Sequence, residues 1–461
     1  MASETRPGTV PGVDGAGPAP GTDGAPRPPM RRVAFSVLIG TTIEWYDFQL
    51  YGAAAALVLA PLYFPSADPL AGTLLAFSTF AIGFGARPIG GIVFGHFGDR
   101  IGRKKVLVLS LTMMGVATFL MGLLPTYAQI GVWAPILLVL LRVVQGLGVG
   151  GEWGGAVLTA VEYSSPRTRG FYGSLPQVGV PAGLVLSTGA FLLVGMLPEE
   201  QFLSWGWRIP FLISIVLVAI GLVIRIQLDE TPVFAKVQVR KERARVPLAT
   251  AVRTYPVQML LAIGSMISTG AYFYIVNTYS LSYVSTAETM GRGELLAAIM
   301  LSGVVAALAL PYFGAMSERF GRRRMILVGL GAMALWIYPT ILAVDSGHLG
   351  WVIGAYVVGA VFFSVSYGPQ ATFIVEMFDA RVRFSAASTS FQIGVLLGGA
   401  CAPIIAAALV RSTGTVLSVA VYVCLVSLVS FFCVLGVSRA TLARGSADLD
   451  GGTDPEEVSG A

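Results

Sequence analysis

The sequence predicts an all-α membrane protein in which twelve transmembrane helices form two halves of six helices each. Composition gives the first evidence, because the 461-residue chain is 55% hydrophobic and only 12% charged, whereas a soluble domain carries roughly 25% charged residues. Apolar stretches of about 20 residues, the length that spans a bilayer, recur from Val33 to Val437. A polar stretch near the middle divides them into two equal sets.

The apolar stretches are the predicted spans. Backbone N–H and C=O groups find no water partner in lipid, so each span is expected to be helical. In chain order, the spans are predicted at residues 33–62, 73–97, 105–124, 133–161, 170–197, 207–227, 254–285, 294–316, 324–343, 349–377, 384–410 and 414–437.

The polar segments complete the expected domain organisation. Residues 1–32 are rich in Gly, Pro and Ala and contain no apolar run, which predicts a disordered cytoplasmic tail and not a signal peptide. An N-terminal six-helix half is expected at 33–227, a cytoplasmic linker at 228–253 and a C-terminal six-helix half at 254–438. The acidic and polar residues 439–461 predict a second disordered tail.

The basic residues predict the orientation in the membrane. Most of the 30 Lys and Arg fall in the two tails, the central linker and every second loop, and cytoplasmic loops carry such an excess. We therefore expect a multi-pass protein of the cell membrane with both termini in the cytoplasm. The same distribution accounts for the net charge of +5 without a nucleic-acid partner.

Nothing in the sequence predicts a metal site, a cofactor or an enzyme active site. The three cysteines lie inside apolar stretches, and the two histidines are far apart. The glycine-rich run that follows Gln145 lacks a preceding strand and the Gly-Lys-Ser/Thr of a phosphate loop. No nucleophile–base arrangement is visible. We expect no metal and no cofactor, and partners limited to a small-molecule substrate, protons and the lipid bilayer around a monomer.

The two halves repeat a charged loop motif. It begins at Gly95 after the second predicted span and at Gly314 after the eighth. Its glycines permit a tight turn, and its acid can cap a helix N-terminus while its arginines reach acids across the loop. A simpler interpretation is that the basic cluster only fixes topology. The repeat favours a gate or ion-pair role for Asp99, Arg100, Arg103, Glu162, Arg169, Glu318, Arg322, Glu376 and Arg383.

Three further motifs carry a family resemblance. Gly40–Phe48, Arg87–Gly91 and Arg142–Glu152 resemble the metabolite:proton symporter family of the major facilitator superfamily. The resemblance covers residues 33–437 and implies the major facilitator fold, with transport by alternating access at the interface of the two halves. It also implies import of a small organic acid, such as a mono- or dicarboxylate or a shikimate-like metabolite, together with protons.

Two other transport functions stay open under this resemblance. One is symport of a zwitterionic osmolyte such as proline or betaine, which the short Gly- and Asp-rich tail disfavours because osmosensing members carry a long helical extension. The other is a uniporter without proton coupling. A non-transporting sensor would usually carry a large signalling domain, and none is visible.

Two carboxylates in the first span are the candidates for proton coupling. Charged groups inside a bilayer are costly and are functional hypotheses by default. Glu44 and Asp47 are three residues apart and share a helix face with Tyr51. Repulsion between paired carboxylates suits proton uptake and release. Alternatively, both are permanent ion-pair partners of Arg87 or Arg142.

Arginine side chains are the candidates for holding an anionic substrate. Arg142, Gln145 and Glu152 fall on one face of the fourth span, and the guanidinium fork suits a carboxylate. Arg142 binds the substrate in one interpretation and forms a pair with Glu152 or Asp47 in the other. Arg87 precedes Pro88 near the loop, which favours an ion-pair or gate role. Neutral substrate contacts are expected from Tyr51, Gln145, Gln177, Tyr272, Asn277 and Gln392.

Overall fold

The computed structural model describes residues 30–65, 69–101, 103–150, 152–226, 247–379 and 382–449. Within these ranges every regular element is a helix. Side chains are described for all of them except a few short stretches, of which residues 95–107 and 224–249 matter here. The expectations for residues 1–29, most of the central linker and the last twelve positions lie outside the described residues.

The first half consists of long helices joined by short ones. Its elements are α1 (Met30–Ala54), η1 (Ala55–Leu59), α2 (Ala60–Tyr63), α3 (Pro69–Ile101), α4 (Arg103–Leu123), α5 (Tyr127–Ile130), α6 (Trp133–Val149), α7 (Glu152–Glu162), α8 (Arg169–Val194), α9 (Glu199–Ser204), η2 (Gly206–Arg208) and α10 (Ile209–Ile226).

The second half has the same plan. Its elements are α12 (Pro247–Thr254), α13 (Pro256–Tyr274), η3 (Ile275–Tyr279), α14 (Ser280–Ala287), α15 (Arg292–Phe320), α16 (Arg322–Ser346), α17 (Leu349–Val375), α18 (Arg383–Val395), η4 (Leu396–Ala400), α19 (Ala402–Thr413), α20 (Leu417–Gly436) and α21 (Arg439–Leu449).

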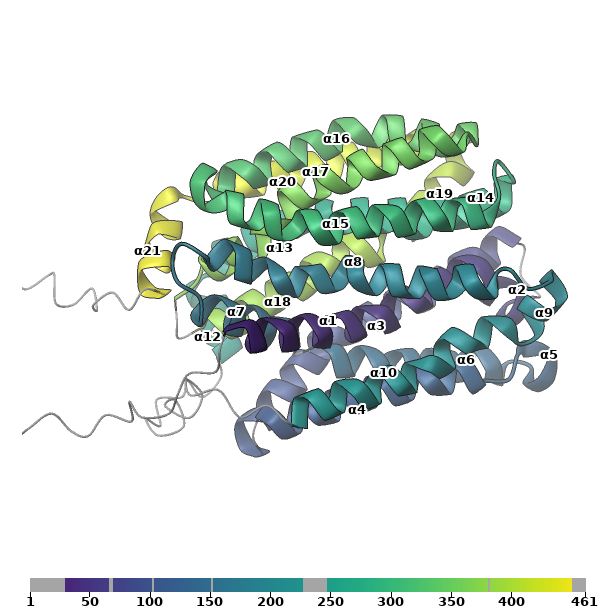
Figure 1. The fold of residues 1–461 in the computed structure, drawn as a ribbon, viewed down its shortest axis with the longest axis horizontal. Coiled ribbons are helices and arrows are strands. Elements are labelled where there is room, and N and C mark those ends of the chain that lie inside the picture. Colours follow the sequence, from purple (N-terminus) through teal and green to yellow (C-terminus); the bar gives the residue numbers. More distant parts are fainter. Residues whose placement is uncertain are drawn as a thin grey trace, which may run out of the picture.

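The long helices run along a common axis, with α12 and α21 at one end of the bundle and α5, α9 and α14 at the other (Figure 1). Among the described residues, 10 helical segments are long and apolar enough to cross a membrane. The apolar part of α4 is shorter, at Val108–Leu123, and α1–α2 carries the buried charges Glu44 and Asp47. With these two, the predicted all-α bundle of twelve membrane helices is confirmed.

Two segments differ from their expected state. The tail expected to be disordered begins instead with α21, because the Ser438 hydroxyl accepts from the Thr441 backbone N–H at 3.0 Å and so caps the first turn. The expected linker already contains α12 at its end. Both helices are too short to cross a membrane, so the search for apolar spans gave no signal for either.

The two halves meet mainly through α8 and α15, which pack along one another. Gly170 and Gly314 make the closest approach, because a Cβ on Gly314 would lie 2.6 Å from the Gly170 carbonyl oxygen. Only residues without a side chain permit this backbone contact. At the opposite end of the bundle, Arg292 lies 3.6 Å from Glu199.

The first span of each half contains a π-helical turn. The two turns are Ala55–Leu59 and Ile275–Tyr279. They lie almost the same number of residues apart in the sequence as the repeated glycines Gly95 and Gly314. In the second turn, the Asn277 Nδ2 donates to the Phe273 carbonyl at 2.8 Å. Such turns widen a helix locally and are frequent at functional sites.

Candidate functional site

Polar side chains from four helices converge inside the first half. Glu44 and Asp47 come from α1, Arg87 from α3, Thr118 from α4, and Arg142 and Gln145 from α6. Each is at most 2% exposed. We call these six residues the buried polar cluster. Burying so many polar groups in an apolar bundle is costly unless they bind one another or a ligand, so their hydrogen bonds decide what the cluster can do.

Four of these side chains form a continuous chain of hydrogen bonds. Arg142 Nη1 donates to Gln145 Oε1. Gln145 Nε2 donates to Thr118 Oγ1 at 2.7 Å, and Thr118 Oγ1 lies 3.1 Å from Asp47 Oδ2, to which it can donate. Among the described residues, Arg142 and Asp47 therefore communicate through two neutral side chains and form no direct ion pair.

Aromatic rings surround the two arginines. The Phe48 ring lies between them, with its centroid 3.5 Å from Arg87 Cζ and 4.6 Å from Arg142 Cζ. The Tyr51 ring lies 3.9 Å from Arg142 Cζ, and its hydroxyl is 2.5 Å from Thr79 Oγ1. Ring faces attract cations but leave the N–H groups in the guanidinium plane without acceptors.

Several polar atoms of the cluster have no hydrogen-bond partner among the described residues. They are Nε and Nη2 of Arg87, Nε of Arg142 and Oδ1 of Asp47. An unsatisfied buried donor costs about 1–3 kcal/mol. The cluster thus keeps cationic donors that an anion can satisfy and a carboxylate oxygen that a proton can occupy. Glu44 acts electrostatically on both Arg87 and Asp47.

Glu152 stands at the start of α7, within the same membrane span as Arg142. Its side chain is buried. The residue between Gly150 and Glu152 lies outside the described residues, so the expected pairing of Glu152 with Arg142 stays a prediction.

The second half approaches the cluster through Tyr274 of α13. Its ring centroid lies 5.4 Å from that of Phe80 and 5.6 Å from that of Phe84, both on α3. The sequence analysis did not select Tyr274, Phe48 or Thr118. Tyr274 is two residues from the expected contact Tyr272 on α13 and so points to a different face of the helix.

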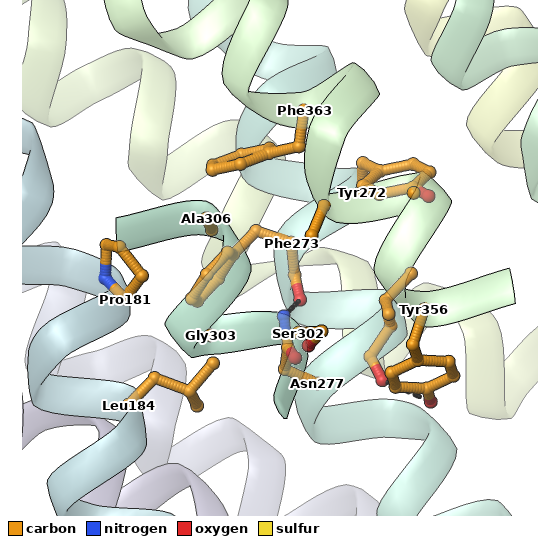
Figure 2. Close-up of a pocket in the computed structure, with 13 residues that line it drawn as sticks. Pro181, Leu184, Tyr272, Phe273, Asn277, Ser302, Gly303, Ala306, Tyr356 and Phe363 are labelled. Carbon is orange, nitrogen blue, oxygen red and sulfur yellow. Dashed lines mark hydrogen bonds between the residues drawn. The ribbon is translucent and has the colours of Figure 1, made fainter. Parts of the chain in front are cut away.

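A small cavity lies where Pro181 and Leu184 of α8 meet helices of the second half. Its volume is about 20 Å³, roughly the room that one water needs. Figure 2 shows its wall, with Asn277 of the seventh span near Ser302 and with Pro181 and Leu184 on the side opposite Tyr272. The expected contact residues Tyr272 and Asn277 both line it, and Asn277 Oδ1 has no hydrogen-bond partner among the described residues.

The expected contacts Gln177 and Gln392 lie where the two halves meet. Gln177 Oε1 accepts from Trp153 Nε1 at 2.9 Å. The Trp153 ring stacks on Phe391 of the second half with centroids 3.7 Å apart. Gln392 Nε2 lies 3.5 Å from the Gly150 carbonyl oxygen. Both amides therefore take part in interhelical contacts close to the interface.

The second copy of the loop motif joins the halves at the α21 end. Glu318 Oε1 accepts from the Gly170 backbone N–H at 2.6 Å, which satisfies a donor in the first turn of α8. Arg322 lies 2.8 Å from Glu318 and 3.0 Å from Glu376. Burial raises the pKa of Glu376 to about 7, against the opposing effect of Arg322.

The arginines that follow the fourth and tenth spans contact α21. Arg383 Nη2 lies 2.8 Å from Asp448 Oδ2 and donates to the Gly445 carbonyl at 3.2 Å. Arg169 Nη1 lies 3.4 Å from Ser446 Oγ. Since Arg169 and Arg383 belong to different halves, α21 contacts both.

The first copy of the motif is described only in part. The side chains of Asp99, Arg100 and Arg103 lie outside the described residues, so their expected gate contacts stay predictions. Glu162 is exposed at the end of α7. The guanidinium of Arg87 lies over the Phe48 ring, and Glu44 acts on it electrostatically, so its expected ion-pair or gate role stays a prediction.

Comparison with known proteins gives consistent matches. A model described as sugar (and other) transporters matches residues 33–259, and a model of the major facilitator superfamily matches residues 261–454. An inner membrane metabolite transport protein of Escherichia coli (strain K12) is 42% identical, over 83% of this chain and 88% of its own. The shikimate transporter of the same organism is 41% identical, over 89% and 95%.

Two further comparisons extend these matches. A proline/betaine transporter of Salmonella typhimurium is 35% identical, over 90% of this chain and 84% of its own. The structure of the xylose transporter XylE from E. coli in a partially occluded inward-open conformation superposes with a TM-score of 0.68. That match has 17% sequence identity and covers 89% of this chain and 98% of that one.

Proposed function

The chain belongs to the major facilitator superfamily, and it is a multi-pass membrane transporter of metabolites and not an enzyme. From this premise we propose that it imports a small organic acid together with protons. One observation carries the proposal: two fully buried arginines keep unsatisfied N–H donors beside Asp47, whose Oδ1 also has no described partner.

The substrate class follows from the charge of the cluster. A carboxylate would satisfy the guanidinium donors of Arg87 and Arg142, which is why an anionic substrate fits. The aromatic rings of Phe48, Tyr51 and Tyr274 offer apolar and stacking surfaces for its carbon skeleton. The small cavity at Tyr272 and Asn277 supplies neutral polar contacts, and the relative that transports shikimate supports a hydroxylated acid.

Asp47 is the proposed proton carrier, with Glu44 as its electrostatic partner. Full burial disfavours a charged carboxylate, and Thr118 gives Asp47 only one hydrogen bond. Protonation from one side of the membrane and release to the other would couple the proton gradient to uptake. Substituting Asp47→Asn removes the titrating group while keeping its shape, so substrate-driven proton uptake should be lost while substrate exchange at equal concentrations continues.

Alternating access would use the contacts at the two ends of the bundle. We place the α21 end in the cytoplasm, because the excess of basic residues predicts it. Contacts of Glu318 with Gly170 and of Arg322 with Glu376 would hold that end closed. Their separation would open the site to the cytoplasm.

Proton uptake by proteoliposomes, recorded with a pH-sensitive dye in the external medium, tests this function. The panel is mono- and dicarboxylates, shikimate, proline and betaine, with protein-free liposomes and the Asp47→Asn variant as controls. Alkalinisation outside on addition of one acid is the expected result. A response to proline or betaine alone would favour symport of a zwitterionic osmolyte, the alternative that the proline/betaine relative supports. Equilibration of a labelled acid without proton movement would show a uniporter and contradict the coupling role of Asp47.

A further inference from the structure

The connection between Asp47 and Arg142 consists of two neutral side chains with a defined direction of hydrogen bonding. Gln145 Oε1 accepts from Arg142, so Gln145 Nε2 faces the other way and donates to Thr118 Oγ1 at 2.7 Å. Thr118 is 0% exposed, so water does not substitute for either neighbour. The proposed proton site and the proposed substrate site are thus joined by one continuous chain of hydrogen bonds.

Thr118 has one hydrogen and two acceptors within reach. Its Oγ1 lies 3.1 Å from Asp47 Oδ2 and 3.0 Å from the Met114 carbonyl oxygen. A hydroxyl donates one hydrogen bond and accepts up to two. The hydroxyl must therefore choose, and the protonation state of Asp47 decides which acceptor it uses.

In both states the Thr118 hydroxyl, Gln145 Nε2 and Asp47 Oδ2 are all hydrogen-bonded. When Asp47 is ionised, Thr118 donates to the carboxylate and accepts from Gln145. When a proton binds Asp47 Oδ2, that new O–H donates to Thr118, whose own hydrogen turns to Met114. The only bond that forms is the O–H of Asp47, and Thr118 keeps its hydrogen throughout. A proton on Oδ1 would find no acceptor among the described residues, so Oδ2 is the favoured site.

We propose that Thr118 and Gln145 form a relay through which protonation of Asp47 releases Arg142 to bind the substrate carboxylate. Donation to a charged acceptor makes a hydroxyl oxygen a stronger acceptor in turn. Ionised Asp47 therefore strengthens the hydrogen bond from Gln145 to Thr118, which keeps Gln145 oriented to accept from Arg142. After protonation, Thr118 accepts from both Asp47 and Gln145, so the hydrogen bonds that fix Gln145 and Arg142 weaken. The inference rests on the proposed proton symport and deepens it, because it makes proton binding favour substrate binding.

Other titratable or charged groups lie in the cluster or on helices packed against α1. Glu44 acts on Asp47 electrostatically, and Asp47 acts on Tyr46. Arg87 on α3 and Arg142 on α6 belong to the buried polar cluster, and Glu152 stands on α7, which packs against α1. The described side chains of α4 and of α10 include no ionisable group. All these groups stay in place when the Thr118 hydroxyl is removed, so substitution of Thr118 separates the relay from direct electrostatics.

The test measures how external pH changes the KM and the kcat for uptake. Wild type, Thr118→Val and Thr118→Ser are compared in proteoliposomes with labelled shikimate, or with the acid that gives a proton signal if shikimate gives none. Couplings between two sites typically amount to about 5–150-fold. We expect the KM of wild type to rise by about tenfold between external pH of about 6 and 8. In Thr118→Val that rise should fall below about twofold, and Thr118→Ser should restore it.

Two controls keep the test decisive. Thr112→Val removes a hydroxyl of the same helix whose one hydrogen bond among the described residues is to the Val108 carbonyl, and it should keep the wild-type pH dependence. If Thr118→Val fails to insert or fold, Gln145→Met breaks the relay at its next link and should also flatten the KM profile. A folded Thr118→Val or Gln145→Met with the full wild-type dependence overturns the relay. If wild type moves no protons with any acid, the symport proposal fails instead.

Discussion

At the scale of single residues, Phe48 determines how two cations can share one buried site. Its ring stands between Arg87 and Arg142, where a carboxylate would otherwise be needed to offset each charge. A ring face attracts a guanidinium without consuming its N–H donors. The arginines are thereby held while their donors stay available to a ligand.

Replacing Phe48 with leucine tests this function of the ring. Leucine keeps an apolar side chain but removes the π face, so two cation–π contacts worth about 0.5–2 kcal/mol each are lost. The matched control is Phe191→Leu, since Phe191 is also fully buried and has no described contact with a cation. We expect the unfolding midpoint of Phe48→Leu to fall further than that of the control. Equal decreases would show that only packing volume matters at Phe48.

A second prediction at this scale concerns Glu376 and pH. Burial raises the pKa of Glu376 to about 7, above the ordinary carboxyl value of 4.5. Between these values the folded protein binds more protons than the unfolded chain, so the free energy of unfolding decreases as pH rises through this window. Arg322, Arg169 and Arg383 oppose the shift, and Glu318 adds to it.

The measurement is the unfolding midpoint of purified protein from about pH 5 to about pH 8, the window in which this carboxyl titrates. Wild type should lose stability as pH rises, and Glu376→Gln should lose less because it has no proton to release. Parallel curves for the two proteins would contradict a raised pKa at this position.

The chemistry of the site was predictable in part from the sequence. Glu44, Asp47, Arg142 and Gln145 were found because charged and amide groups are conspicuous inside apolar spans. Thr118 gave no such signal, since a single threonine in an apolar helix is unremarkable until its neighbours are known. The expected grouping of Glu152 with Arg142 stays a prediction, because the residue before Glu152 lies outside the described residues.

At the scale of elements, α21 contacts both the connection between α17 and α18 and the start of α8, which are far apart in the sequence. Gly445 lies directly against the carbonyl of Glu376, and Asp448 pairs with Arg383. Glu376 and Arg383 flank the connection between α17 and α18, while Ser446 faces Arg169 at the start of α8. The helix thus covers the same end at which Glu318 joins the halves.

Substituting Gly445→Val should detach α21. A Cβ at this position would overlap the Glu376 carbonyl, and relief requires the helix to move away. We expect trypsin to cleave at Arg444 faster in the variant than in wild type, with a small change in the unfolding midpoint. Gly436→Val is a less crowded control, because its Cβ would meet only the flexible end of Leu261 at 3.0 Å. Unchanged cleavage in Gly445→Val would contradict the docked position of α21.

At the scale of the whole molecule, the arrangement of the helices was almost entirely predictable. Apolar length fixes the spans, and the repeated loop motif divides them into two halves, so the predicted boundaries differ from the helices by only a few residues. The sequence could not locate α21, because its docking depends on contacts with Arg383 and Glu376 far away in the chain. Nor could it locate the π turns, which follow from local packing and not from hydropathy.

Closure of the two halves at the α21 end should depend on the glycine contact between α8 and α15. In Gly170→Val the added side chain would overlap the Gly314 carbonyl, so this end cannot close fully. We expect uptake to slow by about tenfold or more, in line with a cost of at least 1.4 kcal/mol for closure. Gly331→Val serves as the control, since nothing lies within 4 Å of its added Cβ. Wild-type uptake by a folded Gly170→Val would show that closure does not need this contact.

The stack of Trp153 on Phe391 gives the protein an internal optical signal. The indole belongs to one half and the phenyl ring to the other, with centroids 3.7 Å apart, and the indole N–H bonds Gln177. Indole emission depends on its surroundings, so parting of the halves would shift the colour and intensity of the Trp153 fluorescence. Once the other six of its 7 tryptophans are replaced by phenylalanine, the unlabelled protein could report its own opening in real time.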